Sequence, residues 1–267
     1  MKKLLSLAIL MTLSLGLFTA CEEDTDSDAT LGLASECNIS NNVENNYKDD
    51  AVRLALRLQQ AGPLASQIEI PQALIDRALG ALSAVYNSDF ATRDSIVEEY
   101  DIHTVDYPAY NEFTLQVDTA YTWVKEWEDG NRLTENAAID ELMNAYSIDL
   151  NGALTPVTVD VAGTELTVFI ANLTSTRALN LGGLVSLFEG VDGVISGNFN
   201  ETGADGNDIA ITDNGNSVEL VYSIGYDADE EAGECLTDCE FRRSWFFTVY
   251  DSDCSAVYTN VEGDPAP

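Results

Sequence analysis

Few residues in this chain could carry catalytic or metal chemistry. Its 267 residues include one histidine, His103, and five cysteines. A Ser-His-Asp hydrolase would have to use His103, but the chain contains no Gly-x-Ser-x-Gly motif. The single histidine excludes a zinc site built from several histidines, and there is no His-Glu-x-x-His motif. We therefore predict no catalytic residue, and we interpret His103 as structural.

Two acidic loops carry oxygen ligands at the close spacing that calcium requires. Residues 205–208 read Asp-Gly-Asn-Asp, and residues 213–216 read Asp-Asn-Gly-Asn. Calcium binds about six to eight oxygens, and a complete EF-hand loop with its final glutamate is missing. We therefore favour two β-turns over a metal site and predict no metal or other cofactor. The candidate ligands for calcium are Asp205, Asn207, Asp208 and Asp213.

Four of the cysteines are predicted to form two disulfides. Cys37, Cys235, Cys239 and Cys254 permit three pairings. A strand predicted over residues 241–250 separates Cys239 from Cys254 and spans about 33 Å, whereas bridged Cα atoms lie within roughly 7 Å. Cys254 should therefore not reach Cys235 or Cys239. The remaining pairing is Cys235–Cys239 across a short loop and Cys37–Cys254 between the two ends of the folded part.

The strand predicted over residues 241–250 has one face that suits a partner. Alternation places Arg242, Phe246 and Tyr250 on that face, together with a serine and a threonine. Aromatic residues and arginine contribute most of the binding energy in protein interfaces. We name these three residues the candidate binding face. The alternative is that helices cover both sides of the strand, which would make Phe246 and Tyr250 core residues.

The first residues carry an export signal. Two lysines precede an apolar run over residues 4–18, which is too short for a membrane span and is typical of a secretory signal. The run ends in Phe-Thr-Ala-Cys at residues 18–21, which resembles the lipobox of bacterial lipoproteins. That resemblance implies that Cys21 is lipidated and becomes the new N-terminus. The alternative is an ordinary signal peptide followed by a chance cysteine.

The acidic residues that follow Cys21 indicate the outer surface of the cell. Glu22, Glu23 and Asp24 come directly after the cysteine, and two further aspartates follow by residue 28. Such a run resembles the surface-export signal of lipoproteins from Bacteroidota-type bacteria. The resemblance covers the signal region alone. It implies an outer-membrane protein that is held by its lipid and faces the cell exterior.

The charge of the chain restricts its partners. Without the two lysines of the signal, 10 basic residues remain against 46 acidic ones, a formal charge of −36. Such a surface repels nucleic acid and anionic lipid headgroups, so membrane contact should come from the lipid anchor alone. The acidity suits a basic partner or a salty habitat, and we favour the habitat. The expected partner is a surface protein or a glycan.

The hydrophobic periodicity predicts an α+β fold. Helical spacing dominates up to residue 100, with one helix expected to begin at Asp49, and strand alternation begins at residue 112. Residues 112–199 then read strand, helix, strand, strand, helix, strand, which is the order of the ferredoxin-like split βαβ, an antiparallel sheet with both helices on one face. A β-meander follows and should extend or pack on that sheet. The predicted divisions are residues 1–20 (signal peptide), 21–36 (acidic tether), 37–111 (helical N-terminal layer), 112–199 (ferredoxin-like unit), 200–263 (C-terminal β-meander with cysteines) and 264–267 (tail).

These features favour a binding or structural lipoprotein without catalysis. Residues 187–194 are similar to the helix-to-last-strand corner of subtilisin-propeptide-type inhibitors, which implies a protease-inhibitor-like module as one alternative. The other alternative is an extracellular hydrolase with two catalytic carboxylates, because 46 acidic residues offer many candidate pairs. An inhibitor should expose a sheet face or an extended C-terminal segment. A hydrolase should show a deep cleft with two facing carboxyl groups.

Overall fold

The computed structural model of the chain describes residues 37, 39–105, 107–161, 164–199, 206–227, 235 and 239–265. Cys21, the signal and the tether lie outside these ranges. The described residues form two antiparallel sheets and the helices that pack on them, which confirms the α+β class. In this part of the chain no helix is long and apolar enough to cross a membrane.

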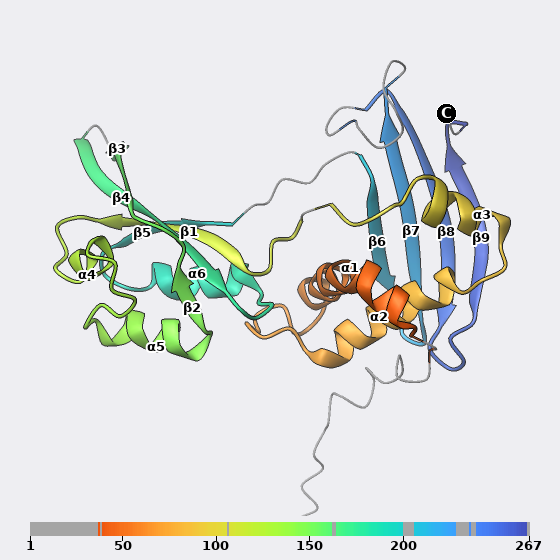
Figure 1. Cartoon of the computed structure of the whole chain (residues 1–267), viewed down its shortest axis with the longest axis horizontal. Coiled ribbons are helices and arrows are strands. Elements are labelled where there is room, and N and C mark those ends of the chain that lie inside the picture. The colour runs from red at the N-terminus through yellow and green to blue at the C-terminus, as the bar shows by residue number, and fades with distance from the viewer. Residues whose placement is uncertain are drawn as a thin grey trace, which may run out of the picture.

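The chain forms two lobes, and the second is inserted into the first (Figure 1). The helix–sheet lobe combines the N-terminal helices with the C-terminal sheet, and the ferredoxin-like lobe lies between them in sequence. The helix–sheet lobe contains α1 (Asn41–Ala61), α2 (Gln72–Tyr86), α3 (Ala91–Asp94), the π-helical turn η3 (Ser95–Glu99), β6 (Asp208–Asp213), β7 (Ser217–Tyr226), β8 (Phe241–Tyr250) and β9 (Ala256–Gly263). The ferredoxin-like lobe contains β1 (Glu112–Asp118), α4 (Val124–Glu128), α5 (Ala137–Ala145), β2 (Ile148–Leu150), β3 (Thr155–Val161), β4 (Thr164–Ser175), α6 (Leu181–Glu189) and β5 (Val194–Asn198).

Helix α1 begins earlier than its charge pattern predicts. Ser40 is the N-cap, and its side chain accepts a hydrogen bond of 3.3 Å from the backbone N–H of Val43. Val43 and Tyr47 are both buried, one turn apart, on the side of α1 that faces the core. The start predicted at Asp49 is therefore wrong, because a cap and an apolar stripe run through the asparagine-rich segment before it.

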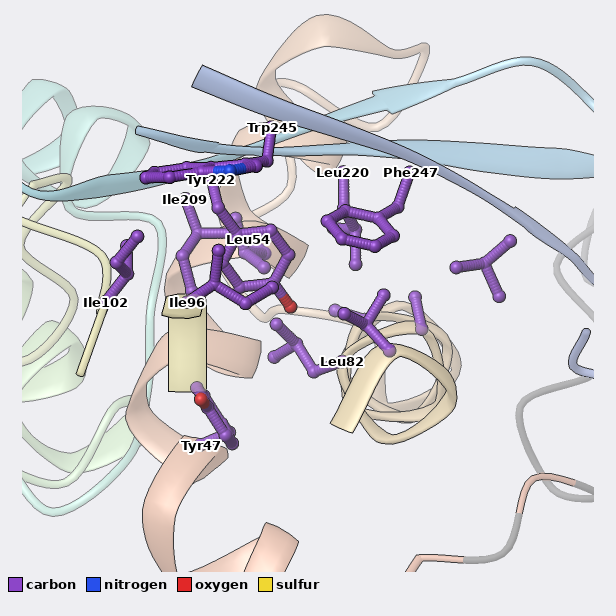
Figure 2. Packing of buried hydrophobic residues seen from close by; sticks show 14 of the residues in the cluster. Tyr47, Leu54, Leu82, Ile96, Ile102, Ile209, Leu220, Tyr222, Trp245 and Phe247 are labelled. Atoms are coloured by element: carbon purple, nitrogen blue, oxygen red, sulfur yellow. The ribbon is translucent and has the colours of Figure 1, made fainter. Parts of the chain in front are cut away.

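One face of the sheet β6-β7-β8-β9 packs against α1 and α2. On β7 and β8 every second residue points toward these helices. In Figure 2 the rings of Tyr222 and Phe247 extend from the sheet toward Leu82 of α2. All three side chains are fully buried. This core joins the N-terminal helices to the C-terminal sheet. Burial of apolar side chains is the dominant favourable term in folding, so it holds these two segments together.

The expectation that the β-meander extends or packs on the ferredoxin-like sheet is therefore wrong. The two sheets are separate, and the meander instead covers the apolar faces of α1 and α2. Amphipathic helices must bury their apolar stripe against another element, and the alternating strands β7 and β8 supply that element. The helical layer and the β-meander are thus one structural unit.

The ferredoxin-like lobe has the strand connections of a split βαβ unit. Strand β1 lies between β4 and β5, β3 pairs with β4, and these pairings are all antiparallel. Strand β2 pairs with the other end of β4, so β3 and β2 lie one after the other along the same edge of β4. Trp127 of α4, Met143 of α5 and Phe188 of α6 are buried in a core with one face of β1 and β4. None of the described helices packs on the opposite face (Figure 1).

The chain crosses between the lobes twice, and both crossings meet at Arg57 of α1. The guanidinium donates hydrogen bonds to the carbonyl oxygens of Tyr107, on the first crossing, and of Ile209 in β6, the strand that follows the second. It also forms a bidentate ion pair with Asp208, with bonds of 3.0 and 3.1 Å. The same carboxylate accepts a hydrogen bond from the backbone N–H of Val105. One arginine therefore joins α1 to the first crossing and to the start of β6, where the second crossing ends.

A second contact between the lobes involves Asn180, the residue before α6. Asn180 is buried, but its side chain makes no capping hydrogen bond to the helix. The side-chain amide instead donates to the carbonyl oxygens of Ala65 and Gln67 in the α1–α2 loop, at 2.8 and 3.0 Å. Arg177 forms an ion pair with Glu69 of the same loop. The loop thus fastens the helix–sheet lobe to the start of α6.

Four cysteines form two disulfides, Cys37–Cys254 and Cys235–Cys239, with Cα separations of 5.4 and 5.6 Å. These are the pairs expected from the length of the strand between Cys239 and Cys254. Cys37 lies just before α1, and Cys254 lies in the turn between β8 and β9. Their disulfide therefore closes the helix–sheet lobe across a sequence separation of 217 residues.

Candidate functional site

The candidate binding face on β8 lies on the outer side of the helix–sheet lobe. Arg242 and Tyr250 are exposed and Phe246 is half-buried, whereas the residues between them, such as Phe247, point into the core. Phe246 stands opposite Val221 of β7 on the same outer side. The helices pack on the other side of the sheet, so the alternative in which Phe246 and Tyr250 are core residues is wrong. The structure brings the three residues onto one face, as the alternation predicts.

The candidate calcium ligands are engaged elsewhere. Asp208 forms the ion pair with the arginine at the lobe crossings, and Asp213 forms one of 3.0 Å with the buried Arg77. The side-chain amide of Asn207 points to a backbone carbonyl, and Asp205 lies outside the described residues. A carboxylate that a guanidinium already neutralises is a poor ligand for a second cation. Over the described ranges, no group of three or more His, Cys, Asp or Glu side chains could hold a metal ion.

His103 has a carboxylate on each side of its ring. Its Nδ1 lies 2.7 Å from Asp50 Oδ2, and its Nε2 lies 3.3 Å from Asp101 Oδ1. The hydrogen bond with Asp50 raises the pKa of His103. Burial alone would raise the pKa of Asp50, but hydrogen bonds from His103 and Thr104 outweigh it and lower that pKa. With both ring nitrogens facing carboxylates, this histidine is placed to join α1 to the first crossing.

A cleft of about 530 Å³ lies where the first crossing meets the ferredoxin-like sheet. Its floor is the face of that sheet on which no described helix packs, and its walls come from α1 and from residues 109–111. The volume is in the range of small-molecule sites, about 300–1,000 Å³. The lining residues with a charge or an aromatic ring are Arg53, Tyr110, Glu112, Phe113 and Phe199.

A line of polar side chains crosses the floor of the cleft. Asn172 of β4 stands opposite Thr114 of β1, and Thr114 also stands opposite Asn198 of β5. The backbone N–H of Asn151, just after β2, donates to the carbonyl oxygen of Asn172 at 2.8 Å and so continues the line. Directly opposed residues of antiparallel strands share a face, so the four side chains span about 14 Å. We name these four residues the polar row.

Around the polar row, the lining of the cleft adds aromatic rings and one charge of each sign. The Arg53 guanidinium lies over the ring of Tyr110, 5.5 Å from its centroid. Phe199 directly follows β5, and its ring packs at the edge of the ferredoxin-like core. Glu112 begins β1 and is exposed. It is the one carboxylate among the described residues that line the cleft.

Sequence reasoning did not find this cleft. Asn172 and Asn198 occupy outward positions of alternating strands, which are ordinarily exposed and without a role. Only the register of β4 and β5 against β1 brings them to the two sides of Thr114. Asparagine is depleted in strands, so its recurrence at outward positions was the one usable signal.

A second groove, of about 660 Å³, adjoins the Cys37–Cys254 disulfide. Asp89 and Asp253 are among its lining residues. A carboxyl group that serves as a general acid needs a raised pKa. Hydrogen bonding by Ser255 instead lowers the pKa of Asp253, so this carboxyl is unsuited to that role.

Comparison with known proteins identifies no relative from which a role could be transferred. No protein-family model, curated protein or solved structure matches the chain. The cleft and the candidate binding face must therefore be interpreted from their own residues.

Proposed function

We propose that the chain is an outer-membrane lipoprotein that faces the cell exterior and binds a ligand without catalysis. The lipid anchor is supported by the lipobox-like residues 18–21, and the outward orientation by the acidic residues after Cys21. The observation that carries the binding role is the cleft between the lobes, with the polar row on its floor. Its described lining residues offer hydrogen bonds and aromatic surface, with a single carboxylate.

The two alternatives have less support. The C-terminal segment is fastened to the sheet, because Asp264 donates its backbone N–H to the carbonyl of Arg242 and Tyr226 donates its hydroxyl to the carbonyl of Pro265. An inhibitor that presents an extended C-terminus would need this segment free, whereas one that presents a sheet face would use the open face of the ferredoxin-like sheet, which is the floor of the cleft. A hydrolase of the expected type needs two facing carboxyl groups, whereas Glu112 is the one carboxylate along the described lining of the cleft.

The variant Cys21→Ser tests the anchor and the orientation. We expect the natural chain to sediment with the outer membrane and to be digested by protease added to intact cells. The variant should leave the membrane fraction, because residue 21 can then no longer carry the lipid that anchors the chain. Unchanged membrane retention of Cys21→Ser after detergent-free washing would contradict the anchor. Resistance of the natural chain in intact cells, but not in lysed ones, would contradict the outward orientation.

The variant Thr114→Arg tests the cleft, because residue 114 is in the middle of the polar row and a long side chain there would cover the floor. The full-length protein, purified in a polyoxyethylene detergent without a sugar headgroup, is heated with neutral oligosaccharides, mixed tripeptides or oligolysine. A probe that binds the folded state raises the Tm by mass action. We expect at least one probe to raise the Tm of the natural chain and not that of Thr114→Arg. If none distinguishes the two proteins, the proposed binding function fails.

A further inference from the structure

We infer that the ligand of the cleft is a neutral carbohydrate, an oligosaccharide chain that lies across the strands of the ferredoxin-like sheet. This inference rests on the proposed binding function and assigns its ligand class. Three features of the cleft carry it: the hydrogen-bonding chemistry of the polar row, the balance of charge around it, and the aromatic side chains of its walls.

The polar row matches the hydrogen-bonding pattern of sugar hydroxyl groups. A hydroxyl both donates and accepts, and it is best paired with groups that do the same. An asparagine side chain has a carbonyl oxygen that accepts and an amino group that donates, and a threonine hydroxyl also does both. A carboxylate would only accept, and a lysine would only donate. Asn151, Asn172 and Asn198 are exposed, so their amide groups face the cleft rather than the core.

The spacing of the polar row favours an elongated ligand. Each member comes from a different strand or strand end, and neighbouring strands lie about 4.8 Å apart. A chain of sugar units laid across the strands would therefore meet a new hydrogen-bonding side chain at each strand. A compact ligand could reach only part of a row that extends for about 14 Å.

The balance of charge in the cleft favours a neutral ligand. The mature chain has a formal charge of −36, yet the described lining of the cleft has one cation, Arg53, and one anion, Glu112. Arg53 is already engaged with the Tyr110 ring and donates to the Thr104 hydroxyl. A sulfated or phosphorylated ligand would need several basic residues. A polybasic peptide would meet more carboxylates on the remaining surface of the protein than in the cleft, so the cleft is not a preferred site for it.

The aromatic walls provide the apolar surface that a sugar ring also needs. A pyranose ring has polar edges and an apolar C–H face, and that face packs on an aromatic ring. Tyr110 and Phe199 are half-buried and line the cleft. Phe199 lies just past the end of β5, where its ring packs at the edge of the ferredoxin-like core and forms part of the lining of the cleft. Tyrosine and phenylalanine supply much apolar area while losing little conformational freedom.

The test measures binding by titration calorimetry with the full-length protein in the same sugar-free detergent. The probes are neutral hexasaccharides of gluco, manno, galacto and xylo configuration, compared with oligogalacturonate, a sulfated oligosaccharide, mixed tripeptides and hexalysine. We expect at least one neutral hexasaccharide to bind. Asn172→Leu and Asn198→Leu should each weaken that binding about fivefold, which corresponds to the loss of one uncharged hydrogen bond. The double variant should weaken it about twentyfold or more.

The matched control is Gln116→Leu. Gln116 is an amide on β1 that points to the same face, opposite Ile170 and Ser196, but it does not line the cleft. Its replacement should leave binding unchanged, and an unchanged Tm in all variants verifies folding. The inference is overturned if no neutral hexasaccharide binds below about 1 mM, or if the double variant binds as well as the natural chain.

A third outcome separates this inference from the proposed function. If peptides or anionic sugars bind, and Thr114→Arg removes that binding while neutral sugars show none, the carbohydrate assignment is wrong and the binding function stands. If Thr114→Arg changes the binding of no probe, both are wrong.

Discussion

At the scale of single residues, Arg77 connects three parts of the helix–sheet lobe. It comes from α2 and is buried, with a side-chain exposure of 2%. The guanidinium pairs with Asp213 in the β6–β7 hairpin and with Asp251 in the β8–β9 turn, at 3.0 and 2.8 Å. It also donates to the carbonyl oxygens of Gly215 and Ser217. One side chain therefore attaches α2 to both hairpins at one end of the sheet.

Arg77→Met should lower the free energy of unfolding by about 3 kcal/mol, because it leaves two carboxylates without their buried partner. The matched control is Arg177→Met, which removes an ion pair whose arginine is 40% exposed and should cost less than about 1 kcal/mol. Urea denaturation of the two variants checks the difference. Equal losses would show that burial of Arg77 adds nothing to the strength of its ion pairs.

His103 makes the stability of the protein depend on pH. The hydrogen bond with Asp50 raises the pKa of His103 in the folded state. The stability that this interaction contributes is therefore complete below the pKa of the unfolded chain, about 6.5, and is lost as the pH rises through the pKa of the folded state. Asp50 has a lowered pKa, so its contribution is present above about 3.9 and is lost as the pH falls through its folded value. Both contributions are therefore complete between these limits, and stability should be highest there.

His103→Gln should flatten the alkaline side of this profile. Glutamine can donate a hydrogen bond to Asp50 at every pH, so the variant should lack the decline in Tm above pH 6.5 that we expect of the natural chain. Because His103 is partly exposed, we expect a difference of roughly 1–2 °C between the two profiles. Thermal melting from pH 5 to pH 9 measures it. Parallel profiles for the two proteins would contradict the assignment of this dependence to His103.

At the scale of elements, strand β8 separates core from surface residue by residue. Its alternation was readable from the sequence, because adjacent residues of a strand point to opposite faces. Phe247 is fully buried beside Tyr222, whereas Tyr250 is 40% exposed. What the sequence left open is whether helices would cover one face of the strand or both, since α1 and α2 are far from β8 in the chain.

Phe246→Ala combined with Tyr250→Ala should therefore change stability little, whereas Phe247→Ala should lower the free energy of unfolding by about 3–5 kcal/mol. The three aromatic side chains belong to one strand, so the comparison isolates the face to which each points. Chemical denaturation measures both variants. A loss of about 3 kcal/mol or more for Phe246→Ala alone would contradict its place on the outer face.

Other elements show where local signals were sufficient and where they were not. The β-hairpin at residues 213–216 contains Asn-Gly, and such a turn needs no distant partner to be recognised. The start of α1 was misplaced because the asparagines around Val43 and Tyr47 hid a helical apolar spacing. Asn180 has the residue type of a helix cap, yet its side chain binds a distant loop, and no local pattern indicates that.

At the scale of the whole molecule, the Cys37–Cys254 disulfide should contribute more stability than Cys235–Cys239. In the chain-entropy model, closure across a sequence separation of 217 residues is worth about 5 kcal/mol, and closure across 4 residues is worth about 2 kcal/mol. Replacing each pair by alanine and measuring urea denaturation checks the order. Peptide mapping without reduction checks the pairing itself, which would be wrong if Cys254 were found joined to Cys235 or Cys239.

The cleft belongs to this scale too, which is why the sequence did not reveal it. Each strand of the ferredoxin-like lobe was recognisable from its own alternation and turns. The polar row, in contrast, exists only through the register between β1, β4 and β5, and Arg53 reaches it from the other lobe. Registers and lobe contacts join segments that are distant in sequence, so they depend on the packing of the complete chain.

The meeting of both lobe crossings at Arg57 has a consequence for how such a protein can change over evolutionary time. The carbonyl oxygens of Tyr107 and Ile209 bind the same guanidinium, so the ferredoxin-like lobe starts and finishes beside one point of its host. Domains whose ends lie close together are tolerated as insertions, because the host core is not disturbed. The ferredoxin-like lobe is therefore suited to replacement as a unit. Recombination at these two positions could replace the sheet that forms the floor of the cleft, and with it the proposed ligand, while the long disulfide and the host fold are inherited intact.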